Sequence, residues 1–160
     1  MLLAQSRVER FAIALGELAL EKKAENVIVM DLRKLGAITD FFVVCNGGVA
    51  QHVKAITNHI TETTAKQGVR VFHQEGYGNL RWVLLDFLDV VVHVFQPAWR
   101  NYYHLEDLWG DARIRVLDEA YLKRKSQRER KEPARKSKTP KATSKGSRVS
   151  EVKGKRGRKS

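Results

Sequence analysis

Apolar residues recur every three or four positions near the start of the chain, a pattern that predicts an amphipathic helix. The apolar stripe consists of Val8, Phe11, Ala12, Leu15, Leu18 and Ala19. Ser6 and Glu9 have capping-box spacing, in which a side-chain oxygen and a carboxylate each satisfy a backbone N–H at a helix start. The stripe ends near Lys22 and Lys23, where cations suit the C-terminus of a helix. The first element is therefore expected to be a helix that ends there.

Runs of β-branched and aromatic residues predict the strands. They lie at residues 27–30, 40–46, 69–73, 82–85 and 90–95. The last two runs are joined by a short acidic turn at residues 86–89, which predicts a hairpin. Residues 90–95 are apolar on both faces apart from His93, as is typical of a central strand that is covered on both sides.

Three further helices are expected. One follows the glycine turn at residues 47–48 and ends near Gly68, a residue suited to a left-handed cap. Pro97 suits the first turn of a short aromatic helix. Residues 111–132 keep apolar side chains at helical spacing before charged residues take over, so a helix with a frayed end is expected there. This order predicts an α/β fold, a two-layer domain with a mixed sheet of about five strands and helices packed on it.

The net positive charge of the chain is confined to its C-terminal end. Residues 1–120 contain 13 Lys and Arg against 15 Asp and Glu, a net charge of −2. Residues 121–160 contain 17 against 3, a net charge of +14. We therefore expect one domain over residues 1–120 and a basic tail over residues 121–160.

The tail is expected to be disordered, because from Pro133 onward it has almost no apolar residues to offset its ordering entropy. It could be an inert solubiliser, or it could bind RNA phosphates with an affinity that falls steeply as salt rises. The candidate nucleic-acid contacts are Lys136, Lys138, Lys141, Lys155, Arg156 and Arg158.

Several protein classes are disfavoured. Cys45 is the only cysteine, which excludes an intrachain disulfide and a zinc-binding cysteine cluster and fits a reducing compartment. Glu9, Arg10 and Glu17 interrupt the apolar N-terminus, against a signal or transit peptide. No stretch approaches the roughly 20 apolar residues of a membrane span. We expect a cytoplasmic protein without membrane contact.

Catalytic patterns are weak. The five histidines are scattered, so no metal site is expected. Asp86 and Asp89 could be paired carboxylates for acid–base chemistry or magnesium, but we favour a role in capping amides at the hairpin turn. The strand, Gly47-Gly48 turn and helix have a phosphate-binding shape without a full Walker or dinucleotide pattern, so a tight connection is favoured. No nucleophile with a base is visible, and we expect neither an enzyme nor a cofactor.

Residues 82–109 hold all three tryptophans and more ring area than a small core usually needs. Tyr, Trp and Arg dominate the energetic centres of protein interfaces. The rings either face a partner or close the C-terminal side of the core.

Several motifs, taken together and in order, resemble the ribosomal silencing factor family, also called the Iojap family. They are Asp31-Leu32, TDFFVV at residues 39–44 with Gly47, Glu75-Gly76, WVLLD at 82–86, DVVVHVF at 89–95 and RNYYHLEDLW at 100–109. The resemblance covers about residues 6–112. It implies a fold related to nucleotidyltransferases but without their catalytic acidic pair.

The resemblance also implies a function. Members of this family bind a large-subunit ribosomal protein, the one numbered fourteen, on the face that meets the small subunit. They thereby prevent subunit joining and silence translation when nutrients are short. The residues that match the partner-facing motif are Trp82, Asp86, Asp89, Arg100, Tyr102, Tyr103, Glu106 and Trp109.

This chain departs from the family pattern in three places. Val49 and Ala50 stand where the family usually has serines, which removes a helix N-cap. Leu88 replaces a usual turn glycine, so the hairpin is expected to be wider or to hold a less favoured conformation. The basic tail lies outside the resemblance.

A slightly acidic domain suits a basic ribosomal protein, and a basic tail suits nearby ribosomal RNA, so the two attachments would reinforce each other. Two other functions stay open, an RNA-binding accessory factor in ribosome biogenesis and a nucleotidyltransferase-like enzyme. A homodimer of the free protein is also open.

Overall fold

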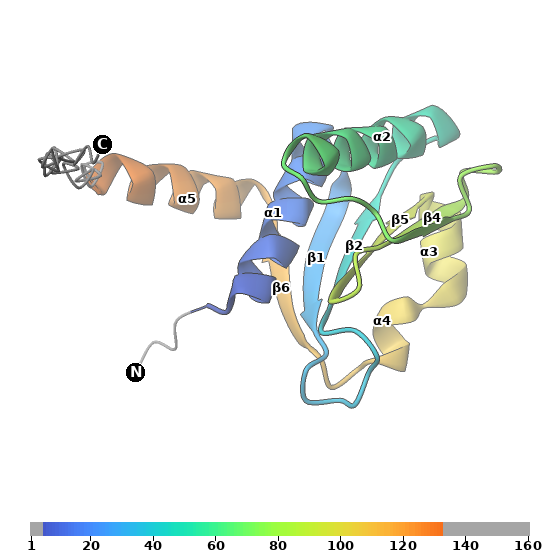
Figure 1. Ribbon diagram of the computed structural model, residues 1–160, viewed down its shortest axis with the longest axis horizontal. Coiled ribbons are helices and arrows are strands. Elements are labelled where there is room, and N and C mark those ends of the chain that lie inside the picture. The colour runs from blue at the N-terminus through green and yellow to red at the C-terminus, as the bar shows by residue number, and fades with distance from the viewer. Residues whose placement is uncertain (1–4, 133–160) are drawn as a thin grey trace, which may run out of the picture.

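The computed structural model describes residues 5–132, which form a six-stranded mixed sheet with helices on both faces (Figure 1). The helices are α1 (Arg7–Glu21), α2 (Ala50–Lys66), α3 (Pro97–Tyr103), α4 (Leu105–Leu108) and α5 (Glu119–Lys131). The strands are β1 (Glu25–Asp31), β2 (Phe41–Asn46), β3 (His73–Glu75), β4 (Trp82–Asp86), β5 (Val90–Phe95) and β6 (Arg113–Leu117). The predicted α/β class and mixed sheet are confirmed.

The strand order is β3-β4-β5-β2-β1-β6. Among the described pairs, β2 and β5 run parallel and the others run antiparallel. The predicted hairpin is the antiparallel pair of β4 and β5, and β5 has a neighbour on each side. The central strand predicted at residues 90–95 is therefore confirmed.

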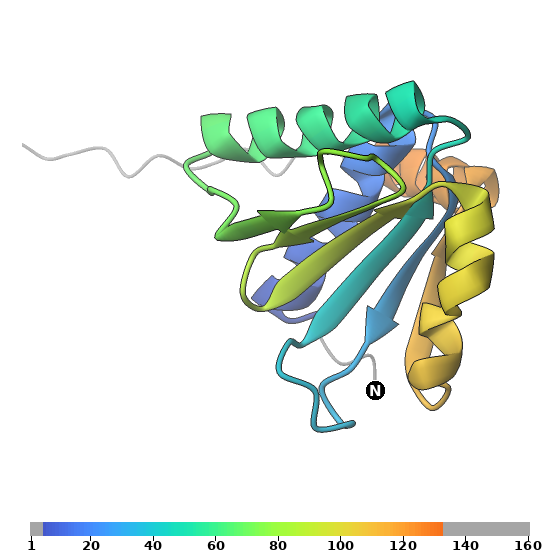
Figure 2. The same ribbon diagram turned by 90° about the vertical axis from the view of Figure 1, so that its right-hand side faces the viewer.

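Helices α1 and α2 cover one face of the sheet and bury the main hydrophobic core (Figure 2). Leu15 of α1, Ile56 of α2 and Val92 of β5 are fully buried in it. Because side chains alternate along a strand, every second residue of β5 points into this core and the others point to the opposite face. The hydrophobic pattern of the sequence thus already divides the sheet into two sides.

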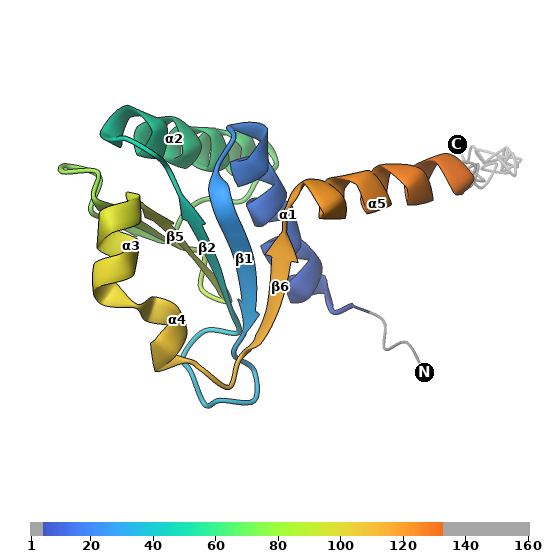
Figure 3. The ribbon, with the colours of Figure 1, turned by 180° about the vertical axis from the view of Figure 1, so that it is seen from behind.

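The opposite face is covered only in part, by the short helices α3 and α4 (Figure 3). Pro97 occupies the first turn of α3, as predicted. His104 then adopts a left-handed conformation (φ +47°), which ends α3 and begins α4. Phe95 and Leu105 are buried in a second, smaller core on this side. The predicted single aromatic helix is therefore two short helices set at an angle.

The helix ends follow the predicted chemistry with one exception. The N–H of Glu9 donates to Ser6 Oγ at 3.1 Å, which caps α1. The Glu9 carboxylate instead lies 3.7 Å from Arg33 and 3.3 Å from Arg115, so half of the capping box forms. At α2, Val49 occupies the N-cap position and offers no side-chain hydrogen bond, as expected from the missing serine.

The helix predicted over residues 111–132 is wrong in its first part. Arg113–Leu117 is strand β6, antiparallel to β1, which makes six strands rather than about five. Ile114 and Leu117 lie three apart and fit a helix, whereas Ile114 and Val116 alternate and fit a strand. The open edge of β1 decides between the two patterns, because β6 provides partners for backbone groups of β1 that would otherwise lack them. The helix begins only at Glu119.

The strand predicted at residues 69–73 is also mostly wrong. Strand β3 spans His73–Glu75, and residues 69–72 are irregular. The N–H of Phe72 still donates to Asp86 O at 2.8 Å, beside the start of the pairing. Alternation over five residues does not fix which of them find hydrogen-bond partners, and only residues 84–86 of the five-residue strand β4 pair with this edge strand.

The predicted boundary at residue 120 falls just inside α5. Within the described part of the predicted tail, residues 121–132, residues 121–131 are helical. Asp118 Oδ1 accepts a hydrogen bond from the N–H of Tyr121 at 2.8 Å and caps this helix. The predictions made for residues 133–160 lie outside the described residues. They are the disorder from Pro133 onward and the nucleic-acid contacts Lys136, Lys138, Lys141, Lys155, Arg156 and Arg158.

Leu88 holds a less favoured conformation, one of the two predicted alternatives, with φ +72° at the hairpin turn. We expect Leu88→Gly to raise the free energy of unfolding by up to about 1 kcal/mol, because glycine has no Cβ penalty at positive φ. Urea denaturation measures the change. Gly36→Ala, at φ +70° in open space, is the reverse control and should lower stability. Equal or lower stability of Leu88→Gly would contradict the assignment of strain.

Candidate functional site

The sheet face that α3 and α4 leave partly open carries a continuous set of rings, here called the aromatic face. Its members are Phe42, Trp82, His93, Phe95, Trp99, Tyr102, Tyr103 and Trp109. Strand pairing assembles it, since Trp82 of β4 lies opposite Phe95 of β5 and Leu84 lies opposite His93. Alternation places all four side chains on this side of the sheet.

Trp82 joins the sheet to α3. Its ring stacks on Phe95 with centroids 4.9 Å apart and packs against Tyr103 at 4.7 Å. Its Nε1–H donates to His93 Nδ1 at 3.1 Å. These contacts hold Trp82 in one orientation while leaving it half-buried. The indole therefore serves the fold and is also available at the surface.

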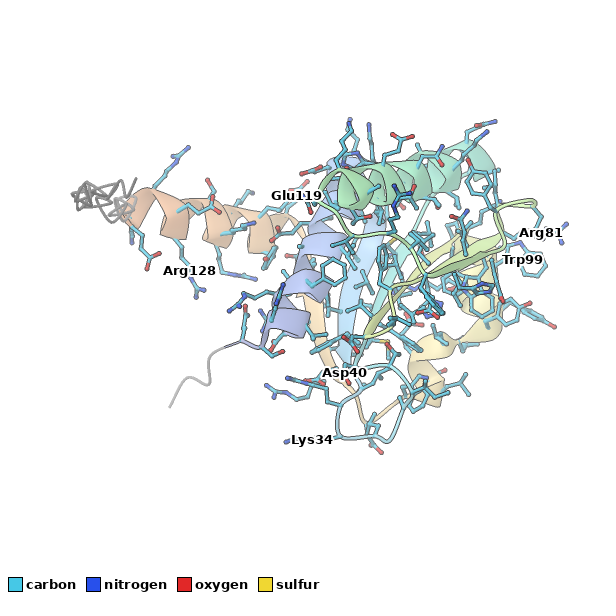
Figure 4. All side chains as sticks on the ribbon, in the orientation of Figure 1. Lys34, Asp40, Arg81, Trp99, Glu119 and Arg128 are labelled. Atoms are coloured by element: carbon cyan, nitrogen blue, oxygen red, sulfur yellow. The ribbon has the colours of Figure 1, made fainter. Side chains whose placement is uncertain are left out.

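The outer part of the aromatic face is open to solvent. Tyr102 and Leu108 are each 73% exposed, and Tyr103 is 44% exposed. The Arg81 guanidinium lies 4.9 Å from the centre of the Trp99 ring, at the end of the molecule remote from α5 (Figure 4). A contiguous apolar surface of this kind marks an interaction site more often than isolated exposed residues do.

A hollow of about 430 Å³ opens beside these rings. Its walls are Phe42, Leu84, Val91, His93 and Trp109, and its rim includes Ile38, Asp86 and Leu88. The Ile38 side chain is fully exposed and Leu88 is 58% exposed. The hollow extends the apolar surface from the helices down to the hairpin turn.

Arg100 and Glu106, both predicted to face a partner, instead meet each other within the fold. Arg100 is 9% exposed and lies 2.7 Å from a Glu106 carboxylate oxygen. It also donates to Asn26 O at 2.6 Å and to Asn46 Oδ1 at 3.0 Å. Asn26 has φ +49° within an irregular stretch of β1, which leaves its carbonyl free of the strand ladder. Arg100 thus ties α3 and α4 to the ends of β1 and β2.

The two aspartates of the hairpin have structural partners. Asp86 Oδ1 accepts a hydrogen bond from the N–H of Leu88 at 2.7 Å, the amide-capping role favoured from the sequence. The carbonyl of Asp89 accepts from the N–H groups of Asp40 and Phe41 at 3.0 and 3.1 Å. Asp86 lies on the rim of the hollow, whereas Asp89 is exposed beyond it.

His93 is the buried polar group of the aromatic face. Because its Nδ1 accepts the Trp82 hydrogen bond, the proton of the neutral ring lies on Nε2. Nε2 is buried and has no hydrogen-bond partner within residues 5–132. Burial lowers the pKa of His93 to about 3, so the ring is neutral at physiological pH.

This pKa predicts a pH-dependent stability. Below the ordinary pKa of 6.5 the unfolded chain binds a proton at residue 93 that the native state does not. The free energy of unfolding should therefore fall by about 1.4 kcal/mol per pH unit as the pH drops from that value toward 3. His93→Asn keeps an acceptor near Nδ1 and does not titrate, so its stability curve, measured by urea denaturation, should be flatter. Parallel curves for the two proteins would contradict this assignment.

Other candidate chemistry finds little support in the described part of the chain. Residues 5–132 contain no group of three metal-binding side chains. Burial raises the pKa of the Cys45 thiol to about 12, as expected for an inert core residue. The Gly47-Gly48 turn is a tight connection, because a Cβ atom added at Gly47 would lie only 2.7 Å from the backbone nitrogen of Val53. Among the described helices, none has the length and apolar character needed to cross a bilayer.

Sequence reasoning missed the exposed Leu108, and it missed Phe42 and Leu84 together with the hollow that these two help to form. The signal was present, because residues 82, 84 and 86 alternate in phase with residues 91, 93 and 95. Only the strand register shows that these sets share one face. Of the eight predicted partner-binding residues, the structure brings Trp82, Asp86, Tyr102, Tyr103 and Trp109 to one surface.

Known proteins resemble this chain along most of its described length. A crystal structure of a protein from Chromobacterium violaceum superposes with a TM-score of 0.60 and 34% sequence identity, covering 68% of this chain and 88% of that one. The ribosomal silencing factor RsfS of Halalkalibacterium halodurans is 45% identical over 92 residues, which are 58% of this chain and 79% of that protein. RsfS of Bacillus subtilis is 41% identical over 98 residues, 61% of this chain and 83% of that protein.

The family described as "Ribosomal silencing factor during starvation" matches residues 5–147. The match runs past about residue 112, where the resemblance inferred from the motifs ends, and enters the basic segment. The prediction that this whole segment lies outside the resemblance is therefore wrong. The family consists of silencing factors rather than enzymes, in agreement with the prediction of a non-enzymatic protein. The chain therefore belongs to the ribosomal silencing factor family.

Proposed function

We propose that this protein binds the large ribosomal subunit through the aromatic face and keeps the small subunit from joining it. The exposure of Tyr102 and Leu108, beside half-buried tryptophans and an open apolar hollow, carries this proposal. A domain of about 110 residues has a radius of gyration near 13 Å and occupies a volume that the small subunit cannot share. No chemical step is required, and translation stays silenced while the protein remains bound.

The proposed partner is large-subunit ribosomal protein number fourteen. Support comes from the motif resemblance and from charge, because the net charge of −2 over residues 1–120 suits a basic ribosomal protein. Arg100 and Glu106 would support the interface from inside by fixing α3 and α4. The proposed direct contacts are Trp82, Asp86, Tyr102, Tyr103 and Trp109.

Sedimentation of purified ribosomal subunits tests the proposal. The protein should migrate with large subunits and leave them unpaired under ionic conditions in which untreated subunits join. The same protein should act in the cytoplasm under nutrient limitation. Failure to migrate with large subunits, or normal subunit joining despite binding, would refute the mechanism. Sedimentation of the free protein would also decide the open question of a homodimer.

A supporting RNA contact is proposed for the basic C-terminal segment, whose candidate residues are Lys136, Lys138, Lys141, Lys155, Arg156 and Arg158. Removing residues 133–160 should weaken ribosome binding mainly at low salt, because phosphate contacts are salt-sensitive. Binding to the isolated ribosomal protein should be unchanged. If the truncation abolished that binding, the division between a specific domain and an RNA-binding segment would be wrong.

A further inference from the structure

Helix α5 concentrates positive charge on an exposed arm. Its 13 residues include six cations, Lys123, Arg124, Lys125, Arg128, Arg130 and Lys131, against Glu119 and Glu129. None of its side chains is buried, and it leaves the body on the side opposite α3 and α4 (Figures 1 and 3). At about 1.5 Å per residue it is roughly 20 Å long. The arm therefore presents cations well away from the aromatic face.

Two partly buried hydrogen bonds to Glu17 of α1, here called the clamp, fix the base of the arm. Tyr121 donates its hydroxyl hydrogen to one Glu17 oxygen at 2.6 Å, and Lys125 donates to the other at 2.7 Å. Burial and the Glu17 hydrogen bond raise the pKa of Tyr121, so the hydroxyl keeps its proton. The clamp holds the first two turns of α5 in one orientation relative to the sheet.

This orientation creates a hollow of about 420 Å³ between α1, β6 and α5. Four cations line it, Arg115, Arg124, Lys125 and Arg128, together with the carboxylates of Glu129 and Glu132. Arg115 is paired with Glu9 at 3.3 Å and Lys125 with Glu17. Within residues 5–132, no carboxylate lies within 4.0 Å of Arg124 or Arg128. These two arginines are therefore available to a ligand.

Arg124 and Arg128 lie one helical turn apart, so both side chains project on the same side of α5. Guanidinium groups bind phosphate oxygens through paired hydrogen bonds. The sequence after α5 is also strongly basic, since residues 133–160 contain 11 Lys and Arg and one Glu. The composition of this segment therefore suits the same class of polyanionic partner.

We infer that α5 and its hollow form a binding site for the phosphate backbone of RNA, with Arg124 and Arg128 as principal contacts. The choice of RNA rests on the proposed function, because RNA is the abundant polyanion at the ribosome. The site and the aromatic face lie at opposite ends of the molecule, as Arg128 and Trp99 show in Figure 4. The protein then has two independent attachments, one apolar and specific, the other electrostatic.

Fluorescence anisotropy with a short labelled single-stranded RNA tests this site on the full-length chain. Arg124→Gln/Arg128→Gln should weaken binding about tenfold at low salt. It should also reduce the slope of log affinity against log salt by about 1.4, since each phosphate contact to a single strand contributes about 0.7. The matched control is Lys54→Gln/Lys66→Gln, which removes two exposed cations from α2 and should change neither quantity.

The outcomes separate this inference from its competitors. Equal losses for both double variants would mean that net charge alone binds RNA, and would overturn the site. Competition by polyglutamate as effective as that by unlabelled RNA would indicate an acidic protein partner instead. Circular dichroism should show unchanged helix content in Arg124→Gln/Arg128→Gln. This variant should still bind isolated ribosomal protein fourteen, so failure of the RNA site would leave the proposed function standing.

Discussion

Replacing Tyr102 with alanine is expected to weaken binding to the large ribosomal subunit by about 30-fold. Truncating a central interface tyrosine costs about 2 kcal/mol or more. The Tyr102 ring is 73% exposed, so its loss should hardly change the free energy of unfolding. Affinity is measured by titrating large subunits with labelled protein, and stability by urea denaturation. Loss of affinity without loss of stability would identify a contact residue.

Phe72→Ala provides the matched control. The Phe72 ring is 71% exposed, and it contacts no ring of the aromatic face within the described chain. Its removal should leave ribosome binding unchanged. Trp82→Ala should also weaken binding, but it deletes the stack on Phe95 and the hydrogen bond to His93 and so lowers stability too. If Tyr102→Ala bound as tightly as Phe72→Ala, the aromatic face would not be the docking surface.

The second large effect is expected at Arg100. Arg100→Leu should lower the free energy of unfolding by about 3 kcal/mol. It leaves the acceptor groups of Asn26, Asn46 and Glu106, which bind the guanidinium in the native protein, without their hydrogen-bond donor. The melting temperature should fall by roughly 10 °C. Subunit binding should weaken as well, since α3 and α4 lose their tie to the sheet. Thermal and urea unfolding measure the change in stability.

Two variants make this result specific. Arg70→Leu removes an exposed arginine from the loop before β3 and should change stability by less than about 0.5 kcal/mol. Glu106→Gln keeps an acceptor for Arg100 and should cost less than Arg100→Leu. Equal stabilities for Arg100→Leu and Arg70→Leu would show that the internal network does not hold the helices in place.

Local chemistry allowed several elements to be predicted closely. Ser6 capped the first helix, Gly68 took the left-handed cap with φ +81°, and Pro97 began α3, because each effect depends on residues adjacent in the sequence. The strain at Leu88 was predictable for the same reason. Residues 114–117 fitted the period of a helix and that of a strand, and prediction failed there, since the choice depended on pairing with β1 residues 84 to 90 positions earlier.

The sequence by itself determined the α/β class, the segregation of charge, the hairpin and the aromatic segment, because periodicity, composition and capping are properties of neighbouring residues. The tertiary structure alone decided which side chains form the candidate site. It buried Arg100 among groups from β1, β2 and α4, and it joined Phe42, Leu84 and His93 into one apolar hollow. The physical reason is that surface exposure and contact depend on strand register and helix docking, which bring together residues far apart in the chain.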